Sequence, residues 1–239
     1  MKPLLSKTED QDSLQTLGRA SVQIVHDLKN QLNGLKLYAT FLRRRMEKSE
    51  RPADELETVA KLLAGLERAA GDLSTLVQFG RPIEVKRQPG VDLQKLVRGV
   101  VASLADHPRA TGPLTGPLNA QFELEMTPDP LVGEFDPTLL SDALKSISIG
   151  ALKIRQLKDK EAKLQIRVGQ NGSQEVAVIE WLGLDALDHD PFAAFAGSDE
   201  IRMSLGAKII SAHGGAAAHQ ANRLLVQLPI DKAAGNGGN

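Results

Sequence analysis

One stretch decides the fold of the first part of this chain: S-V-Q-I-V-H-D-L-K-N-Q-L-N-G-L-K-L-Y-A-T-F-L-R-R-R-M, residues 21–46. Its apolar and small residues recur at alternating spacings of four and three, and the rhythm already begins at Leu14. A rhythm sustained over four heptads predicts a long helix that packs against other helices. We expect this helix to run from about residue 13 to residue 49, after a frayed leader over residues 1–12.

His26 lies outside this apolar seam. With Val25 at heptad position a, His26 falls at b, Asn30 at f and Asn33 again at b. The three positions therefore share one polar, outward face of the helix. A histidine on that face is either a solvated surface residue or a reactive group, and the stretch alone leaves both interpretations open.

Leu37 and Phe41 also fall on the outward side of the helix, after His26 and Asn30. Exposed apolar residues near a reactive group are typical of a surface that docks a partner. The alternative is that the second domain or a dimer mate covers them. The sequence pattern is compatible with both.

A second heptad run extends from Leu56 to Val77 and ends at Gly80 and Pro82. Pro52 suits the first turn of this helix, and the short connection predicts two antiparallel neighbours. Two helices alone leave wide apolar faces uncovered. We therefore expect a second copy of the chain to complete a dimeric four-helix bundle.

The composition excludes several classes of protein. The chain has 239 residues, a net charge of −1 and no cysteine, which excludes a disulfide framework and a cysteine-based zinc site. Aromatic residues make up only 3 %, and no apolar run approaches the ~20 residues of a membrane span. The N-terminus becomes acidic too early for a signal peptide. We expect a cytoplasmic protein with no nucleic-acid or membrane partner.

Beyond residue 80 the heptads give way to a linker, expected over residues 81–92, and then to mixed elements. Asp136 and Pro137 are typical of a helix N-terminus, and Q-N-G at 170–172 is typical of a hairpin turn. The pattern predicts helices over 93–104, 137–157 and 201–212, and strands over 121–126, 163–168, 175–181 and 223–228. The domains expected are a helical hairpin (1–80), an α+β sandwich (93–232) and a disordered tail (233–239).

H-D-L-K-N, inside a long helix with an antiparallel partner, resembles the phosphoacceptor box of two-component histidine kinases. The second half is similar to the ATP-binding domain of that family. It has, in order, V-D-L-x-K-L-V, F-D-P-T-L-L-S-D-A-L, a hairpin, P-F-A-A-F, a helix ending A-H-G-G, and a closing L-V-Q-L-P. The resemblance covers roughly residues 13–230.

The resemblance implies that His26 carries a phosphoryl group, which requires an exposed imidazole with a free lone pair. Asp27 is then a proton acceptor or an orienting group, or simply a solvated charge, since it points about 100° away on the helix. Asn30 is similar to the residue that positions water for dephosphorylation. Lys29 either offsets phosphoryl charge or is a solvated lysine, and it joins Asn33 in the expected docking surface.

The nucleotide-binding motifs of that family are changed at six positions. Ser146 and Gly150 stand where the family's nucleotide helix has two asparagines. In the D-x-G-x-G motif, Trp181 replaces the Asp and Asp185 replaces the second Gly. Glu200 and Arg202 replace two glycines of the phosphate lid. Gly150 offers no oxygen ligand to Mg²⁺, and the indole of Trp181 offers a donor where an acceptor is needed and fills space. Glu200 repels phosphates. These changes predict a degenerate domain that does not bind ATP.

The leading hypothesis is a dimeric histidine phosphotransferase that relays a phosphoryl group between receiver-domain aspartates through His26. It implies no bound cofactor and no metal of its own, because Mg²⁺ comes with the receiver. Two alternatives remain: a divergent ATP-dependent histidine kinase, and a non-catalytic dimeric scaffold that binds response regulators.

Overall fold

The computed structural model describes residues 5–49, 52–104, 121–157, 162–171, 175–185, 187–194 and 197–231, and only the backbone of residues 5–24 and 26. The chain divides into two compact units, Met1–Pro82 and Ile83–Asn239. The tail predicted to be disordered, residues 233–239, lies outside the described residues. Each unit is taken separately below.

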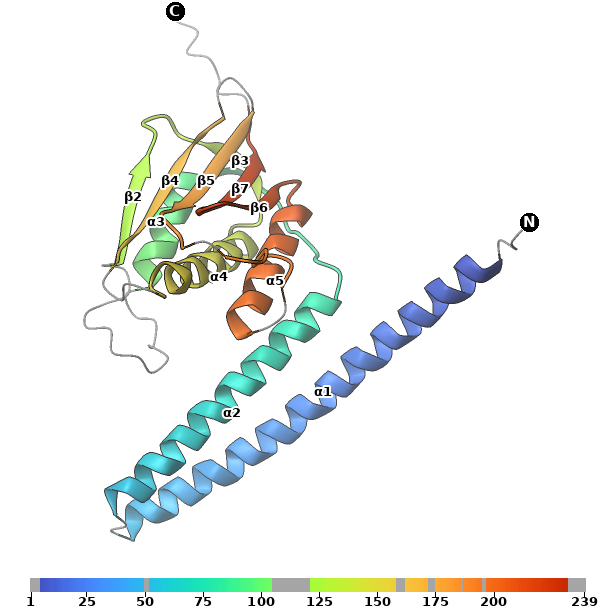
Figure 1. The fold of residues 1–239 in the computed structure, drawn as a ribbon, viewed down its shortest axis with the longest axis vertical. Coiled ribbons are helices and arrows are strands. Elements are labelled where there is room, and N and C mark those ends of the chain that lie inside the picture. The colour runs from blue at the N-terminus through green and yellow to red at the C-terminus, as the bar shows by residue number, and fades with distance from the viewer. Residues whose placement is uncertain are drawn as a thin grey trace, which may run out of the picture. The chain divides into compact units, whose positions relative to one another are not determined.

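The first unit is a hairpin of two long helices, α1 (Leu5–Lys48) and α2 (Ala53–Gly80) (Figure 1). The predicted frayed leader is wrong over residues 5–12, which are helical; no glycine or proline interrupts the chain between residues 5 and 17. Ala39, Val59 and Leu63 form the buried core between the helices, as the heptads predicted. Each described helix of the chain is too short or too polar to cross a membrane.

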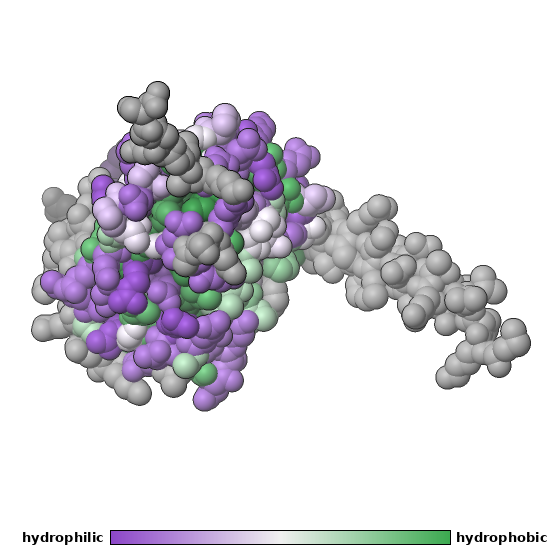
Figure 2. Space-filling view, turned by 90° about the horizontal axis from the view of Figure 1, so that it is seen from above, coloured by the Kyte–Doolittle hydropathy of each residue, from purple (hydrophilic) through white to green (hydrophobic). Residues whose placement is uncertain are grey.

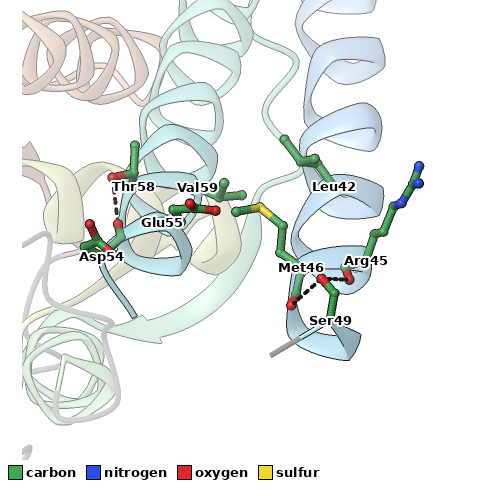
Figure 3. A pocket seen from close by; sticks show the side chains of 8 residues that line it. All are labelled: Leu42, Arg45, Met46, Ser49, Asp54, Glu55, Thr58 and Val59. Carbon is green, nitrogen blue, oxygen red and sulfur yellow. Dashed lines mark hydrogen bonds between the residues drawn. The ribbon is translucent and has the colours of Figure 1, made fainter. Parts of the chain in front are cut away.

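The connection between α1 and α2 leaves a groove of about 520 Å³ at the end of the hairpin, drawn in Figure 3. Met46 points from α1 toward Val59 of α2, and the Ser49 hydroxyl donates to the carbonyls of Arg45 (3.0 Å) and Met46 (3.2 Å). These bonds satisfy carbonyls of the last helical turn, which have no partner within the helix. The hairpin end is thus built from local capping contacts.

The second unit contains a five-stranded sheet in the order β2-β4-β5-β7-β6. Its strands are β2 (Phe122–Met126), β4 (Leu164–Gln170), β5 (Val176–Leu182), β6 (Ala216–Gln220) and β7 (Arg223–Pro229). Only the β2–β4 pair is parallel. The predicted hairpin is confirmed, because β4 and β5 pair antiparallel with Gln170 opposite Ala177.

Three strands were not predicted. β1 (Gln88–Asp92) and β3 (Val132–Phe135) pair with each other in a separate two-stranded sheet, and β6 is an edge strand. The linker prediction for residues 81–92 is therefore wrong over β1. β1 contains Pro89 and Gly90, and β6 consists mainly of alanine, so neither carries the β-branched alternation that marks a strand.

Three helices pack on one face of the five-stranded sheet: α3 (Leu93–Ser103), α4 (Pro137–Arg155) and α5 (Ser198–Ala212) (Figure 1). Ile147 of α4, Ile210 of α5 and Ile179 of β5 are all fully buried in the core between these layers. Alternate residues of β4, β5 and β7 point into this core, as period-two patterning requires.

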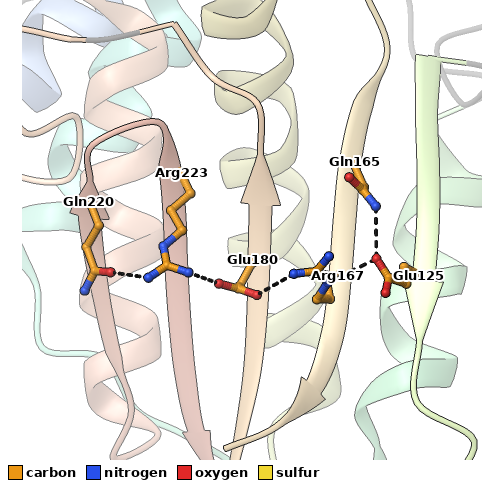
Figure 4. Close-up of polar contacts among 6 residues, drawn as sticks. All are labelled: Glu125, Gln165, Arg167, Glu180, Gln220 and Arg223. Atoms are coloured by element: carbon orange, nitrogen blue, oxygen red, sulfur yellow. Dashed lines mark hydrogen bonds and ion pairs between the residues drawn. The ribbon is translucent and has the colours of Figure 1, made fainter.

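The opposite face of the sheet carries a row of polar side chains across all five strands (Figure 4). Arg223 donates to Glu180 (2.6 Å) and Arg167 donates to Glu125 (3.0 Å). Gln220 of β6 forms one end of the row, and Glu125 of β2 forms the other, where it also accepts from Gln165 of β4 (3.0 Å). On the face shown in Figure 2, hydrophilic residues likewise surround smaller hydrophobic areas. The sheet therefore buries one face only, as is usual for a largely antiparallel sheet.

Asp136 joins three parts of the second unit. Its side chain caps α4 by accepting from Thr138 (3.1 Å) and Leu139 (3.0 Å), and it also accepts from the Lys86 N–H (3.0 Å). Its own N–H donates to Nε2 of the fully buried His213, at the end of α5 (3.0 Å). Asp136 therefore links the segment around Lys86, the start of α4 and the end of α5.

This junction predicts a dependence of stability on acid. The hydrogen bond from Leu139, followed by those from Lys86 and Thr138, lowers the pKa of Asp136 from its ordinary 3.8 against the opposing effect of burial. The ionised carboxylate thus stabilises the fold above about pH 4, and this contribution is lost as the pH falls through the lowered pKa. Asp136→Asn should cost about 1 kcal/mol at neutral pH, because one amide oxygen replaces two carboxylate oxygens.

Urea unfolding at pH 7 and pH 3 measures this effect. The gap in stability between wild type and Asp136→Asn should narrow at pH 3. Asp142→Asn, an exposed change on the same helix, is the matched control and should leave the pH profile unaltered. A constant gap between pH 7 and pH 3 would contradict the prediction.

Candidate functional site

The predicted phosphoacceptor position lies in the regular part of α1. The side chain of His26 is outside the described residues, so only its place on the helix is given. Helical periodicity puts positions 26, 30 and 33 on one face, and the side chains of Asn30 and Asn33 are exposed. Asp27 is exposed and lies about 100° around the helix, whereas Lys29 is half-buried. The helix thus presents amide groups to solvent beside position 26.

Leu37 and Phe41 continue this outward face. Their side chains are 53 % and 56 % exposed. Large apolar side chains with this exposure on a described helix are compatible with a contact surface, whether for a partner or for another copy of the chain.

A second exposed apolar stripe lies on a different side of α1. Leu28, Leu35 and Leu42 recur every seven residues and are 43–53 % exposed, and Tyr38 beside them is 71 % exposed. By helical periodicity this stripe borders the side on which Ala39 packs against α2, whereas Leu37 and Phe41 point the other way. Leu35 and Leu37 thus lie on nearly opposite sides of the helix, and Tyr38, three residues before Phe41, lies between the two surfaces.

The residues that the sequence resemblance aligns with nucleotide-binding motifs lie on or next to β5, α4 and α5. Trp181 of β5 is 1 % exposed, and its indole N–H donates to the hydroxyl of Ser148 on α4 (3.0 Å). Ser148 is itself buried, two residues along α4 from both Ser146 and Gly150. The bulky indole is thus part of the core, with its polar group satisfied inside the protein.

Met203 of α5 closes the space beside Gly150. A Cβ atom added to Gly150 would lie 2.2 Å from the Met203 Sδ. A side chain at this position therefore fits only if Met203 moves. Met203 is 1 % exposed. The sequence did not identify Met203 or Ser148 as functional residues, although both lie within or next to the aligned motifs. Their importance follows from their packing against Gly150 and Trp181.

The first turn of α5 is acidic, and its carboxylates have side-chain partners. Lys153 of α4 pairs with Asp199 (2.6 Å), and His189 pairs with Glu200 (2.7 Å). Arg202 lies 4.0 Å from Asp199. Of the other predicted positions in this region, Ser146 and Asp185 are half-buried. The structure therefore brings carboxylates to the segment where the related motif has phosphate-facing glycines.

The contact of Gly150 with Met203 gives a stability prediction. Gly150→Ala should destabilise the protein by about 1–2 kcal/mol, the lower part of the overpacking range, because methionine is flexible and yields in part. Gly99→Ala is the matched control: a Cβ at this position of α3 meets nothing within 4 Å, and alanine should gain up to about 1 kcal/mol from helix propensity.

Chemical denaturation of the two variants tests this, and a double-mutant cycle with Met203→Ala isolates the contact. We expect Gly150→Ala to cost less, or nothing, in the Met203→Ala background, with a coupling of about 1 kcal/mol. If the stability effects of Gly150→Ala and Met203→Ala are additive, Met203 does not limit the size of the side chain at position 150.

The sequence matches no protein-family model and no curated protein. Its structure resembles full-length ShkA, solved in complex with AMPPNP, with a TM-score of 0.61 and 18 % identity over 88 % of this chain and 45 % of ShkA. It also resembles the histidine kinase AdeS of Acinetobacter baumannii, with a TM-score of 0.52 and 16 % identity over 83 % of this chain and 95 % of AdeS. The chain spans less than half the length of ShkA. The predicted histidine-kinase-like fold is confirmed.

Proposed function

We propose that this chain is a histidine phosphotransferase of two-component signalling. His26 accepts a phosphoryl group from the aspartate of one receiver domain and passes it to another, without binding ATP. The observation that carries the proposal is the filled region between β5, α4 and α5. There the side chains of Trp181 and Met203 take the place of a nucleotide pocket.

Three features of that region oppose nucleotide binding together. The indole of Trp181 is a donor that already bonds to Ser148, so it offers no acceptor to an adenine amino group. Gly150 supplies no oxygen to Mg²⁺, and the contact with Met203 leaves no room for a longer side chain there. Glu200 and Arg202 stand where the related phosphate-lid motif has glycines, which let the backbone approach the phosphates.

The transfer itself needs few groups. An imidazole nitrogen of His26 attacks the phosphorus of the aspartyl phosphate, an N–P bond forms, and the P–O bond to the departing carboxylate breaks. The ring proton then leaves to solvent or to Asp27. Mg²⁺ supplied by the receiver offsets charge on the phosphoryl group, so this chain needs no cofactor of its own. Asn30 is placed one turn away, where it can orient water for hydrolysis.

A homodimer is part of the proposal. The stripe formed by Leu28, Leu35, Leu42 and Tyr38 leaves a long apolar surface on the two-helix hairpin. Pairing two hairpins into a four-helix bundle would bury that stripe and leave the face of position 26 accessible. Sedimentation of the chain tests this: a Leu35→Glu, Leu42→Glu variant should become monomeric.

The decisive experiment incubates the chain with the receiver domains of the same genome, each phosphorylated by phosphoramidate and Mg²⁺. Acid-labile, base-stable phosphate should appear on the chain with at least one receiver, and a second receiver should remove it. Absence of label with every receiver would reject the proposal.

The two alternatives give different results. An ATP-dependent kinase would be labelled by γ-labelled ATP without a receiver and would change the fluorescence of Trp181, the only tryptophan, in a saturable way. We expect neither. A scaffold would bind receivers but would not accept phosphate.

A further inference from the structure

The five-stranded sheet has two edges, β2 on one side and β6 on the other. Both strands have five residues, so length does not distinguish them. β2 carries the exposed carboxylates of Glu123 and Glu125, whereas β6 reads A-A-A-H-Q and has no Lys, Arg, Asp, Glu or Pro. Native sheets usually protect an edge with charges or proline, because its unpaired backbone groups bind further strands. β6 is therefore the less protected edge.

The backbone of β6 leaves hydrogen-bonding groups at this edge. A two-residue turn joins β6 to β7, so Gln220 and Arg223, which face each other across it, form a hydrogen-bonded pair. Such pairs alternate along two antiparallel strands, so every second residue of β6 directs its N–H and C=O away from β7. These residues are Ala217 and His219, and no described strand lies beyond them.

The side chains of β6 do not cover these groups. Ala216 is exposed, and Ala217 and Ala218 are half-buried. The imidazole Nε2 of His219 lies 3.1 Å from the carbonyl oxygen of Ala221 in the adjoining turn, so the ring lies along its own hairpin. Methyl side chains let a further strand approach to the normal separation of about 4.8 Å. The edge is thus open to an extended chain.

The outward groups are arranged symmetrically about Ala218, which points to a second copy of the chain. If two β6 strands run antiparallel across a two-fold axis at Ala218, then Ala217 of each copy faces His219 of the other. Each such pair exchanges two backbone hydrogen bonds, so the outward groups of both residues find partners. The side chains add no repulsion, because β6 has no Lys, Arg, Asp or Glu and each His219 faces an alanine.

We propose that β6 pairs with β6 of a second copy and joins the two sheets edge to edge. This contact is separate from the proposed pairing of the helical hairpins, and it does not depend on phosphotransfer. A few backbone hydrogen bonds hold two chains weakly, but a hairpin-paired dimer presents two β6 edges and can bind with both. The two interfaces together would assemble such dimers into larger, two-fold symmetric complexes.

Sedimentation velocity of the full chain tests this pairing, with protein concentration as the variable. The wild type should approach about twice the mass of its smallest species as the concentration rises. Ala218→Lys should remove this rise, because two lysines would face each other at the axis, and Ala218→Glu should do the same. An equal mixture of the two variants should restore the rise, because lysine then faces glutamate.

Two further variants control for the fold. Gln227→Lys makes the same change in charge on the same face of the sheet, but on β7, and should assemble like the wild type. Ala217→Pro removes an N–H that points outward, which an edge strand tolerates. Its circular dichroism should therefore match that of the wild type, while the assembly is lost.

The outcomes decide the proposal. A wild-type mass that does not change with concentration overturns it, which is also the result expected of an edge that binds only an unrelated peptide. Assembly of Ala218→Lys alone, or no restoration in the mixture, overturns it too. The Leu35→Glu, Leu42→Glu variant lacks paired edges, so its rise in mass should need at least about tenfold more protein. If it assembles like the wild type while the Ala218 mixture is restored, the hairpin dimer is wrong and the pairing of β6 stands.

Discussion

His26→Ala should abolish phosphoryl transfer, lowering the amount of acid-labile phosphate on the chain by at least about a thousandfold, to background. The imidazole provides the only lone pair that the proposed reaction uses, and alanine provides none. Alanine is the best helix former, so α1 should remain folded. Quantitative labelling from a phosphoramidate-charged receiver, with circular dichroism as the folding check, measures this result.

A matched histidine controls for indirect effects. His189 lies in the second unit and pairs with Glu200, and His189→Ala should be labelled like the wild type. His26→Gln retains a polar side chain and should be as inactive as His26→Ala. Phosphoryl flow between receivers that survives either change at position 26 would favour the scaffold over the phosphotransferase.

Trp181→Ala should have the largest effect on stability, about 3–5 kcal/mol, because it removes the largest fully buried side chain and leaves a cavity between β5 and α4. Trp181→Phe should cost less, since the ring remains and only the bond to Ser148 is lost. Ser148→Ala leaves the buried indole N–H without an acceptor and should cost about 1–3 kcal/mol.

Urea unfolding followed by circular dichroism measures these changes, because the variants lose the only tryptophan. In the double variant Trp181→Phe, Ser148→Ala both polar partners are gone, so it should be no less stable than Trp181→Phe alone. If the loss of stability in the double variant equals the sum of the losses in Trp181→Phe and Ser148→Ala, the hydrogen bond between the two side chains does not couple them.

Trp181→Asp restores the residue of the related motif but should not restore ATP binding. The carboxylate would be buried near Ser148, and Met203 would still lie against Gly150. This variant therefore separates loss of one residue from loss of the whole pocket.

The helical hairpin could be predicted because its information is local. Heptads encode the packing of Ala39 against Val59 and Leu63, and Asp136-Pro137 encodes the start of α4. The first turns of α1 were missed because they carry no apolar rhythm, although their residues permit a helix. β1 was missed because its pairing with β3, about forty residues away, makes it a strand, and β6 because its alanines carry no strand pattern although it pairs with the adjacent β7.

The candidate site divides in the same way. The replacements at Gly150 and Trp181 could be read from aligned motifs, and so could the expectation that the indole fills space. The identity of its acceptor, Ser148, and the position of Met203 depend on how α4 and α5 pack, which no single stretch encodes. Leu37 and Phe41 could be identified as outward-facing from the heptad pattern alone, and both are exposed on α1.

The filled space between β5, α4 and α5 has a consequence for how the protein senses the state of the cell. A domain that binds a nucleotide gains folding free energy by mass action, in proportion to the logarithm of the nucleotide concentration. In the proposed phosphotransferase this gain would be absent, and the burial of Trp181 and Met203 would stabilise the domain instead. The proposed relay would then run at the same capacity in starved and well-fed cells, so its signal would report the state of the upstream receiver and not the cellular energy charge.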